Sequence, residues 1–292
     1  MKPEDRIVRL HDARAISVRS GGDPDGFPLL ALHGTPGSRL KFDGLGAACA
    51  SSGVRVLAVD RWGYGATLPH ARPSLAAFAA DMAALADALD IDRFAVLGVS
   101  GGGPFAAAVA AMLGDRVAAL ALVAPVGPMV GCPREFAPGL VHAVCLQALP
   151  LVPGLMGLSF GALKAALAVS PQLGLRLVMA RAPRPDREII ADPESMASMA
   201  GALAEGMRAG VDGAVTDMAL FAAAWDVDAE RILARSKLWI GLQDANVPLG
   251  PARWLASLIR NCEVEECPGE GHFWIARQPE QVVAWVVGAV RA

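Results

Sequence analysis

Three side chains that could perform nucleophilic catalysis together stand in order along this chain, each close to glycine. Ser100 is the centre of Gly98-Val99-Ser100-Gly101-Gly102, Asp244 follows an apolar run, and His272 closes Gly269-Glu270-Gly271-His272. A serine hydroxyl is a poor nucleophile until a base within hydrogen-bond reach takes its proton, and a carboxylate can orient that base. The three residue types therefore indicate acyl transfer through a Ser–His–Asp triad.

The Gly-x-Ser-x-Gly pattern occurs twice, and the surroundings distinguish the two copies. A catalytic serine of this kind needs a strand before it and a helix after it, because the sharp turn between them lifts the serine above the sheet. The Ser100 copy follows the strand-like run 94–97 and precedes the alanine-rich run 106–108. The copy in Gly157-Leu158-Ser159-Phe160-Gly161 has neither flank, so we interpret Ser159 as a coincidence.

The same glycines could also form a dinucleotide-binding turn. Gly101, Gly103 and Ala106 fit the relaxed Gly-x-Gly-x-x-Ala fingerprint after a strand. Such a site requires an acidic residue at the end of the next strand, and that strand ends here in Ala124-Pro125-Val126. The pattern also lies in mid-chain rather than at the first strand–helix turn, so the sequence disfavours a nucleotide cofactor.

The elements around these motifs predict an α/β architecture. Short apolar runs alternate with helical patterns, which is typical of a mostly parallel central sheet flanked by helices. Ser74 is the expected N-cap of a helix with one apolar stripe over 75–89. The expected strands are 7–10, 15–20, 29–32, 54–59, 94–99, 117–123, 237–242 and 262–267, and further helices are expected at 39–51, 102–113, 251–259 and 279–290.

The alternation stops after the sixth strand. Residues 127–214 contain many prolines and broken helical segments but no convincing strand, which predicts a helical cap (lid) inserted into a core domain formed by 1–126 and 215–292. Within this cap, 136–163 carries no charged residue and is long enough to raise a membrane span. Prolines near its middle break it into two short apolar helices, so we expect no span.

With these motifs in place, the sequence resembles the α/β-hydrolase family over nearly its whole length. Five motifs of that family occur in the family's order, and a serine, aspartate, histidine order is the one this fold uses. They are His33-Gly34-Thr35-Pro36-Gly37, Asp60-Arg61-Trp62-Gly63-Tyr64-Gly65, the Ser100 turn, Gly241-Leu242-Gln243-Asp244-Ala245-Asn246-Val247-Pro248 and Gly269-Glu270-Gly271-His272. The resemblance implies the α/β-hydrolase fold with a helical cap after the sixth strand.

The resemblance also implies catalytic roles for individual residues. Ser100 would attack a carbonyl, His272 would take the serine proton, and Asp244 would orient the imidazole. Asp217 and Asp226 are the rival candidates for the acid, but they lie in or near helical segments rather than at the end of a late strand.

The oxyanion hole is expected to come from two backbone N–H groups. Gly101 follows the nucleophile, and Thr35 lies in the loop after an earlier strand. Pro36 in that loop has no N–H to donate. His33 is expected to brace the loop, and Asp60 is expected to cap its own turn.

The cap should roof an apolar pocket that keeps water away from the reaction. The alternative is that its apolar residues form the core of the cap or a dimer interface, which leaves a homodimer open. The residues concerned are Phe136, Leu140, Val144, Leu155, Met156, Phe160 and Met179.

Composition argues against several other classes of protein. The 292 residues carry a formal net charge of −3 without a dense Lys/Arg stripe, so we expect no nucleic-acid partner. Five cysteines without regular spacing do not resemble a disulfide framework, and no zinc-binding pattern occurs, so no metal is expected. The charged N-terminus lacks the apolar region of a signal peptide, which makes a reducing cytoplasm the expected location.

These observations predict a serine hydrolase that cleaves an ester or lactone bond of a small, largely apolar substrate through an acyl-enzyme, without a metal or organic cofactor. Two alternatives stay open. The same triad could perform carbon–carbon bond hydrolysis, thioester cleavage, acyl transfer or a lyase reaction, because fold and triad do not separate these chemistries. The fold could also belong to a ligand-binding protein with little turnover.

Overall fold

The protein folds around one eight-stranded sheet, seen in a computed structural model that describes residues 3–291. The strand order is β1-β2-β4-β3-β5-β6-β7-β8. β2 runs antiparallel to both neighbours, and all pairs from β4 to β8 are parallel. The strands are β1 Glu4–Arg9, β2 Ala15–Gly22, β3 Phe27–Leu32, β4 Val54–Val59, β5 Phe94–Val99, β6 Val117–Val123, β7 Arg235–Gly241 and β8 Cys262–Cys267.

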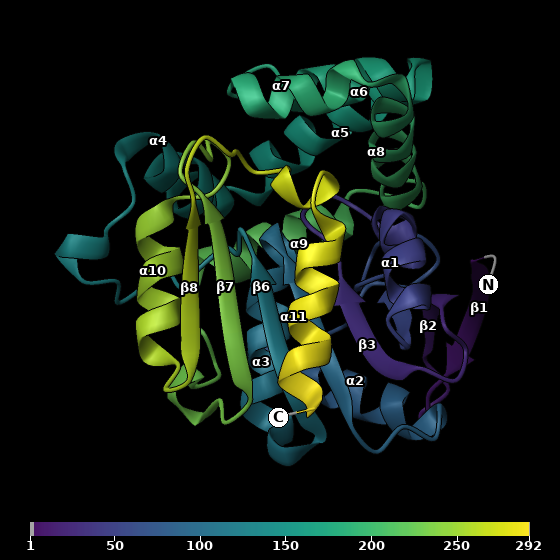
Figure 1. The fold of residues 1–292 in the computed structure, drawn as a ribbon. Helices are drawn as coiled ribbons and strands as arrows, with labels where there is room; N and C mark the ends of the chain where they lie inside the picture. Colours follow the sequence, from purple (N-terminus) through teal and green to yellow (C-terminus); the bar gives the residue numbers. More distant parts are fainter. Residues whose placement is uncertain (1–2, 292) are drawn as a thin grey trace.

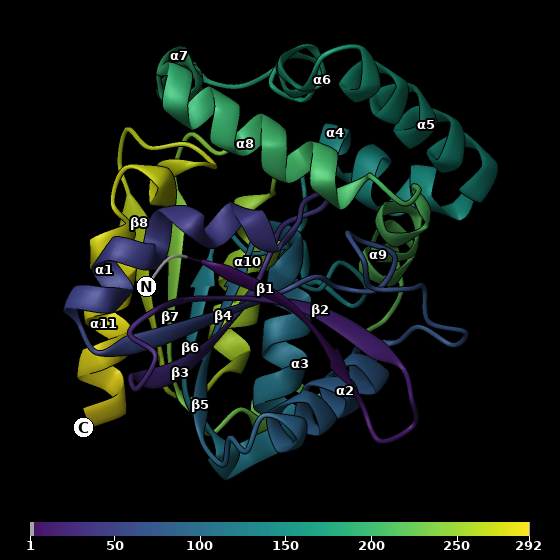
Figure 2. The ribbon, with the colours of Figure 1, turned by 90° about the vertical axis from the view of Figure 1, so that its right-hand side faces the viewer.

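Helices cover both faces of this sheet and one of its ends. They are α1 Gly46–Ser51, α2 Leu75–Ala88, α3 Gly103–Leu113, α4 Leu140–Ala143, α5 Pro153–Val169, α6 Pro171–Val178, α7 Arg184–Ala191, α8 Pro193–Gly206, α9 Asp212–Ala222, α10 Leu249–Leu258 and α11 Pro279–Arg291. α1 and α11 pack on one face, and α2, α3 and α10 pack on the other (Figures 1 and 2). This is the mostly parallel, helix-flanked sheet that the sequence predicts.

Alternating side chains explain why both faces are covered. In β3, Leu30 and Leu32 point into the cluster under α2 and α3, whereas Leu29 and Ala31 point into the cluster under α11. Successive side chains of a strand face opposite sides of a sheet, so a strand that is apolar throughout must be buried on both. The run Phe27–Leu32 therefore belongs in the middle of the sheet, beside the strand that carries the Ser100 turn.

The strand predictions agree with the structure to within a few residues. Four strands have the predicted bounds, namely β4, β5, β6 and β8. The two opening strands are longer than predicted, since β1 begins at Glu4 and β2 continues to Gly22. These extensions are held by backbone pairing at the margin of the sheet, such as Gly22 with Arg55, and polar or glycine-rich ends carry no apolar signal.

The predicted helix 39–51 is instead a 3-10 segment, Arg39–Leu45, followed by α1. Ser38 is positioned as an N-cap but does not cap this segment, because its hydroxyl donates to the carbonyl of Ala202, 2.8 Å away. A tertiary contact with α8 thus replaces the local one that the sequence favours.

The helices between β6 and β7 lie above the carboxyl ends of the parallel strands (Figure 1). The predicted cap boundary at residue 214 falls inside α9, whose Met218 and Phe221 pack into the larger core cluster. The uncharged stretch bends by 110° between Leu140–Leu151 and Pro153–Val169. Within residues 3–291 no single helix is long and apolar enough to cross a membrane, although this bent pair meets that length and composition when taken together.

Candidate active site

Ser100 lies on a sharp turn between β5 and α3. Its φ of +55° is in the left-handed region, which residues with a side chain rarely adopt. A Cβ at Gly98 would lie 2.6 Å from the Ala106 Cβ and 2.8 Å from the Gly102 carbonyl oxygen, so this crossing of strand and helix requires glycine. The strand, the turn and the helix have the arrangement of a nucleophile elbow.

The second Gly-x-Ser-x-Gly copy lacks this geometry. Ser159 is an exposed residue within α5, and its hydroxyl donates to the carbonyl of Leu155, 2.9 Å away. A serine that bonds to the carbonyl four residues earlier is an ordinary helix-surface arrangement. Ser159 therefore offers no strand-to-helix turn that could present a nucleophile.

Asp244 and His272 follow two neighbouring parallel strands, which brings them together. Gly241 at the end of β7 pairs with Cys267 at the end of β8, and the loops after both strands leave the same edge of the sheet. The Nδ1 atom of His272 lies 2.7 Å from the Oδ2 atom of Asp244. Both side chains are almost fully buried, so solvent does not compete for this contact.

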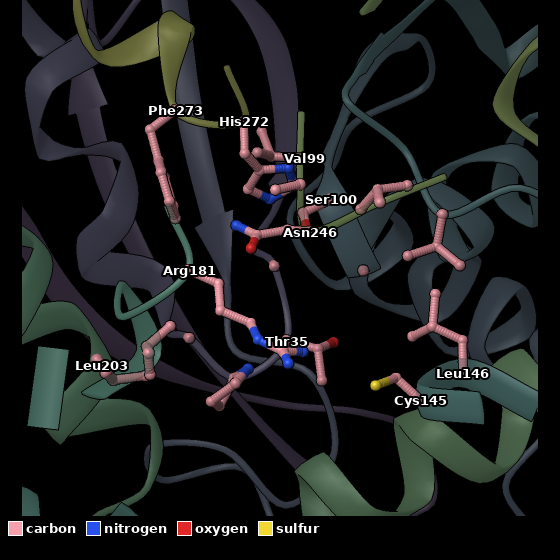
Figure 3. Close-up of a pocket in the computed structure, with 18 of the residues that line it drawn as sticks. Thr35, Val99, Ser100, Cys145, Leu146, Arg181, Leu203, Asn246, His272 and Phe273 are labelled. Carbon is pink, nitrogen blue, oxygen red and sulfur yellow. The ribbon is translucent and has the colours of Figure 1, made fainter. Parts of the chain in front are cut away.

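The other carboxylate oxygen of Asp244 is held by its own loop. Oδ1 accepts the backbone N–H of Asn246 at 2.8 Å and that of Val247 at 3.0 Å. With Oδ1 occupied, Oδ2 is left to face the imidazole. His272 and Ser100 line the same cavity (Figure 3). Within the described residues they are not hydrogen-bonded to each other, which is common for such pairs before substrate binds.

The two expected oxyanion-hole residues are also neighbours. Leu32 of β3 pairs with Gly98 of β5, so the loop after β3 begins beside the Ser100 turn. A Cβ at Gly101 would lie 2.8 Å from the Cβ of Thr35, which shows how closely the two backbones approach. Gly101 is in the first turn of a helical segment, where N–H groups have no intrahelical acceptor.

A buried carboxylate on α9 anchors this loop. Oδ2 of Asp217 accepts the Thr35 hydroxyl at 2.6 Å, the Tyr64 hydroxyl at 2.6 Å and the Arg61 guanidinium at 2.5 Å. Burial and the neighbouring Asp217 charge raise the pKa of Tyr64 well above its usual value, so its hydroxyl stays a donor. Asp217, a rival for the triad acid in the sequence, is a structural hub in the fold.

Removing the Asp217 carboxylate should therefore destabilise the protein strongly. Asp217→Ala leaves the Arg61 guanidinium buried without its partner, which costs about 3–5 kcal/mol of the free energy of unfolding. Asp226→Ala is the matched control, because Asp226 is exposed and only caps the start of α2 through the N–H of Leu75. Losing such a cap costs about 1 kcal/mol. Urea denaturation measures the free energy of unfolding of both variants. Equal losses in the two would contradict the structural role assigned to Asp217.

A second buried carboxylate supports the histidine loop, and the sequence offered no signal for it. Asp186 of α7 is fully buried and accepts the backbone N–H groups of His272 and Phe273, each at 3.0 Å. In the sequence it looks like any acidic residue in the first turn of a helix. Its partners lie 86 and 87 residues further along the chain, beyond the reach of any local pattern.

His33 and Asp60 are both buried structural groups. Burial lowers the pKa of His33 well below its usual value, so the imidazole is neutral while Nδ1 bonds the Gly34 carbonyl at 2.8 Å. Asp60 accepts the backbone N–H and the guanidinium of Arg39, both at 2.7 Å, although burial raises its pKa. Asp60 thus holds the start of the 3-10 segment rather than capping its own turn as predicted.

Ser100, Gly101, Thr35 and His272 all face one cavity of about 500 Å³ (Figure 3). The inserted helices contribute most of the opposite wall. Its lining there includes Val141, His142, Cys145 and Leu146, Leu175, Leu177 and Val178 of α6, and Met199, Ala202 and Leu203 of α8.

None of the seven apolar residues predicted to line the pocket does so. Met156 and Phe160 pack into or against the larger core cluster, and Met179 packs with Leu175 and Ala200 inside the cap. Leu140, Val144 and Leu155 are exposed, and Phe136 lies against α10 at Gly250. Met179 thus fits the alternative that these residues form the core of the cap, because apolar composition alone does not reveal which side of a helix the fold turns toward the cavity.

Within residues 3–291 no group of three or more His, Cys, Asp or Glu side chains is placed to hold a metal ion.

A serine on a strand-to-helix turn, with an aspartate–histidine pair at the same cavity, is typical of one class of proteins, the α/β hydrolases. Comparison with known sequences identifies the same class. A family model for the alpha/beta hydrolase fold matches residues 28–273, and the chain belongs to this family. Over 125 residues, 42% of this chain, it is 37% identical to a non-heme chloroperoxidase from Streptomyces lividans, of which the match spans only 45%.

Similar solved structures cover the whole chain. One is an alpha/beta hydrolase fold protein from Nakamurella multipartita, with 25% identity, 99% of both chains covered and a TM-score of 0.68. Another is an esterase from Exiguobacterium antarcticum, with 18% identity, 99% of this chain and 100% of that chain covered and a TM-score of 0.72. Both confirm the predicted fold.

Proposed function

We propose that this protein is a serine hydrolase that cleaves an ester or lactone bond of a small, largely apolar substrate through an acyl-enzyme. The observation that carries the proposal is the convergence on one cavity of Ser100, on its strained turn, and the 2.7 Å His272–Asp244 pair. A cavity of about 500 Å³ suits a small molecule. The likeness to an esterase supports the fold of such an enzyme.

In the proposed mechanism, the Ser100 Oγ atom attacks the substrate carbonyl while His272 takes the hydroxyl proton. The N–H groups of Thr35 and Gly101 stabilise the oxyanion that forms. The carbon–oxygen bond then breaks, and the leaving alcoholate takes the proton from His272. Water repeats the sequence on the acyl-enzyme, which releases the acid and restores Ser100. Asp244 keeps the imidazole in the required tautomer throughout.

A covalent inhibitor gives the most direct test of this proposal. Diethyl p-nitrophenyl phosphate transfers its diethylphosphoryl group to an activated serine and releases p-nitrophenolate. We expect one equivalent of p-nitrophenolate per chain, and mass spectrometry should locate the added group on the peptide that contains Ser100. Hydrolysis of p-nitrophenyl esters should be lost in proportion to the fraction of protein labelled. In the unlabelled protein, the acyl chain length that is hydrolysed fastest shows how long an acyl group the cavity accepts.

Two variants control the labelling. Ser159→Ala should be labelled like the wild type, because Ser159 lies on the surface of α5. Ser100→Ala should not be labelled. A wild-type protein that neither reacts with the inhibitor nor hydrolyses any ester of the series would favour the ligand-binding alternative, and labelling of Ser100→Ala at full stoichiometry would refute the nucleophile.

A further inference from the structure

Among the residues that the structure describes, the cavity that holds Ser100 is lined by two cationic side chains and by no carboxylate. The two cations are Lys41 and Arg181. Lys41 comes from the 3-10 segment of the core, and Arg181 comes from the turn between α6 and α7. The two cations therefore reach the cavity from the core and from the inserted helices. Figure 3 shows the Arg181 side chain extending into the cavity.

Neither cation has an ionic partner within residues 3–291. Neither forms a salt bridge at 4.0 Å or less, and neither side chain donates a hydrogen bond. By contrast, the buried Arg39 is paired with Asp5, Asp60 and Glu205. Two unpaired cations in one cavity leave a positive charge that a ligand can neutralise.

The surroundings of Lys41 make this charge costly without a ligand. Lys41 is partly buried, and loss of hydration lowers its pKa to about 8, against a small opposing effect of Asp186. Its ammonium lies 5.2 Å from the centre of the Phe273 ring, beside His272. The acceptors of Asp186 are already occupied by backbone N–H groups. An anion placed here would compensate for the lost hydration of the ammonium.

Other charged groups near Lys41 lie on α8 and at its start. Lys41 also borders an adjoining cavity of about 280 Å³, which Asp192 and Glu194 line. Asp192 is engaged as the N-cap of α8 through the N–H of Ser195, at 2.8 Å. Neither carboxylate borders the cavity that holds Ser100, so the charge in that cavity remains positive.

We propose that the natural substrate carries a carboxylate at the end away from its ester bond, and that Lys41 and Arg181 bind this carboxylate. The proposal rests on the proposed hydrolase function. The same cavity is also lined by apolar side chains, such as Val178, Met199 and Leu203, which suit a hydrocarbon spacer between the carboxylate and the ester. Arginine can hold a carboxylate by two parallel hydrogen bonds, and lysine adds a point charge. The substrate class is therefore a monoester, or a lactone, that bears a free carboxylate.

A pair of esters of equal length tests this proposal. Mono-p-nitrophenyl adipate has a terminal carboxylate where p-nitrophenyl hexanoate has a methyl group. We expect wild-type kcat/KM to be about 10- to 100-fold higher for the adipate ester, the range of a charged hydrogen bond. Lys41→Met and Arg181→Met should each lower the adipate/hexanoate ratio at least severalfold. Arg176→Met is the matched control, because Arg176 is exposed on α6 outside the cavity and should keep the wild-type ratio.

The pH dependence of the adipate/hexanoate ratio of kcat/KM distinguishes the contribution of Lys41 from that of the catalytic groups. The adipate carboxylate is ionised over the whole range, and both esters use the same catalytic groups, so the ratio cancels the titration of His272. As pH rises from 7 to 9, Lys41 loses its proton around pH 8 and the ratio should fall. Lys41→Arg should keep a high ratio without this fall, since arginine stays charged. Uncatalysed hydrolysis is subtracted at each pH.

A binding measurement tests the carboxylate site independently of the proposed ester hydrolysis. Calorimetric titration of Ser100→Ala, which should not turn the ester over, with monomethyl adipate should detect binding that Lys41→Met and Arg181→Met in the same background weaken by about 10-fold or more. If this holds while neither p-nitrophenyl ester is turned over, the carboxylate site stands and the proposed function falls. If both esters are hydrolysed with equal kcat/KM and the variants do not change the ratio, the function stands and the carboxylate site is wrong.

Discussion

Ser100→Ala should lower kcat for ester hydrolysis by a factor on the order of 10⁶, the loss seen when the nucleophile of a serine triad is removed. The variant loses the hydroxyl that forms the proposed acyl-enzyme, while the N–H groups of Thr35 and Gly101 remain in place. The residual rate should therefore exceed hydrolysis in water by about 10³-fold. Measurement requires rigorously purified protein, because wild-type contamination at one part in a million would mask the loss.

Ser159→Ala is the natural control for this experiment. It changes the same residue type in the same five-residue pattern, but Ser159 bonds within α5 and faces solvent. Its kcat should stay within about a factor of two of wild type, since surface substitutions of this kind change little. Thermal melting of both variants checks that each is folded. Ser100→Ala with more than a tenth of the wild-type kcat would remove Ser100 from the mechanism.

Asp244→Asn should lower kcat by about 10⁴-fold with a much smaller change in KM. The amide is close in shape to the carboxylate, and its oxygen can still accept the N–H groups of Asn246 and Val247. Its NH₂ group then faces Nδ1 of His272, where a donor meets a donor unless the imidazole changes tautomer. In that tautomer Nε2 carries the proton and cannot accept one from Ser100, so the loss falls on the chemical step.

The two rival aspartates provide the comparison. Asp226→Asn should keep nearly full kcat, because Asp226 caps α2 and does not line the cavity that holds Ser100. Asp217→Asn should act mainly through stability and through the Thr35 loop that Asp217 holds. If Asp217→Asn abolished turnover in folded protein while Asp244→Asn remained active, the acid of the triad would have to be reassigned.

The predictions for Ser100→Ala and Asp244→Asn both depend on strand ends that converge at one edge of the sheet. The loops that carry Thr35 and Ser100 follow adjacent strands β3 and β5, and those that carry Asp244 and His272 follow adjacent strands β7 and β8. In an open parallel sheet, ligands bind at the carboxyl ends of the strands, where the strand order reverses. Residues as far apart in the sequence as Thr35 and His272, 237 positions, therefore reach one cavity.

The sequence by itself determined the sheet and the residues that gather at its edge. Apolar runs such as Val54–Val59 and Phe94–Val99 could be bounded to the residue, because a strand buried on both faces is apolar throughout and stops where it leaves the core. The glycines at 98 and 102 indicated a sharp strand-to-helix turn, because glycine is needed on both sides of a serine where the backbones of strand and helix approach closely. Motifs that follow parallel strands could then be expected to lie close together, since the carboxyl ends of parallel strands share one edge of the sheet.

Only the tertiary structure decided which groups surround that edge. Asp217 could be placed on a helix but not beside Thr35, and Asp186 looked like an ordinary helix-start acid until it met the His272 loop. Lys41 and Arg181 carried no sequence signal at all. The apolar wall was misassigned because the cap helices are apolar on more than one side. Their inward face depends on how they pack over the sheet, and that packing is set by contacts between distant segments rather than by local periodicity.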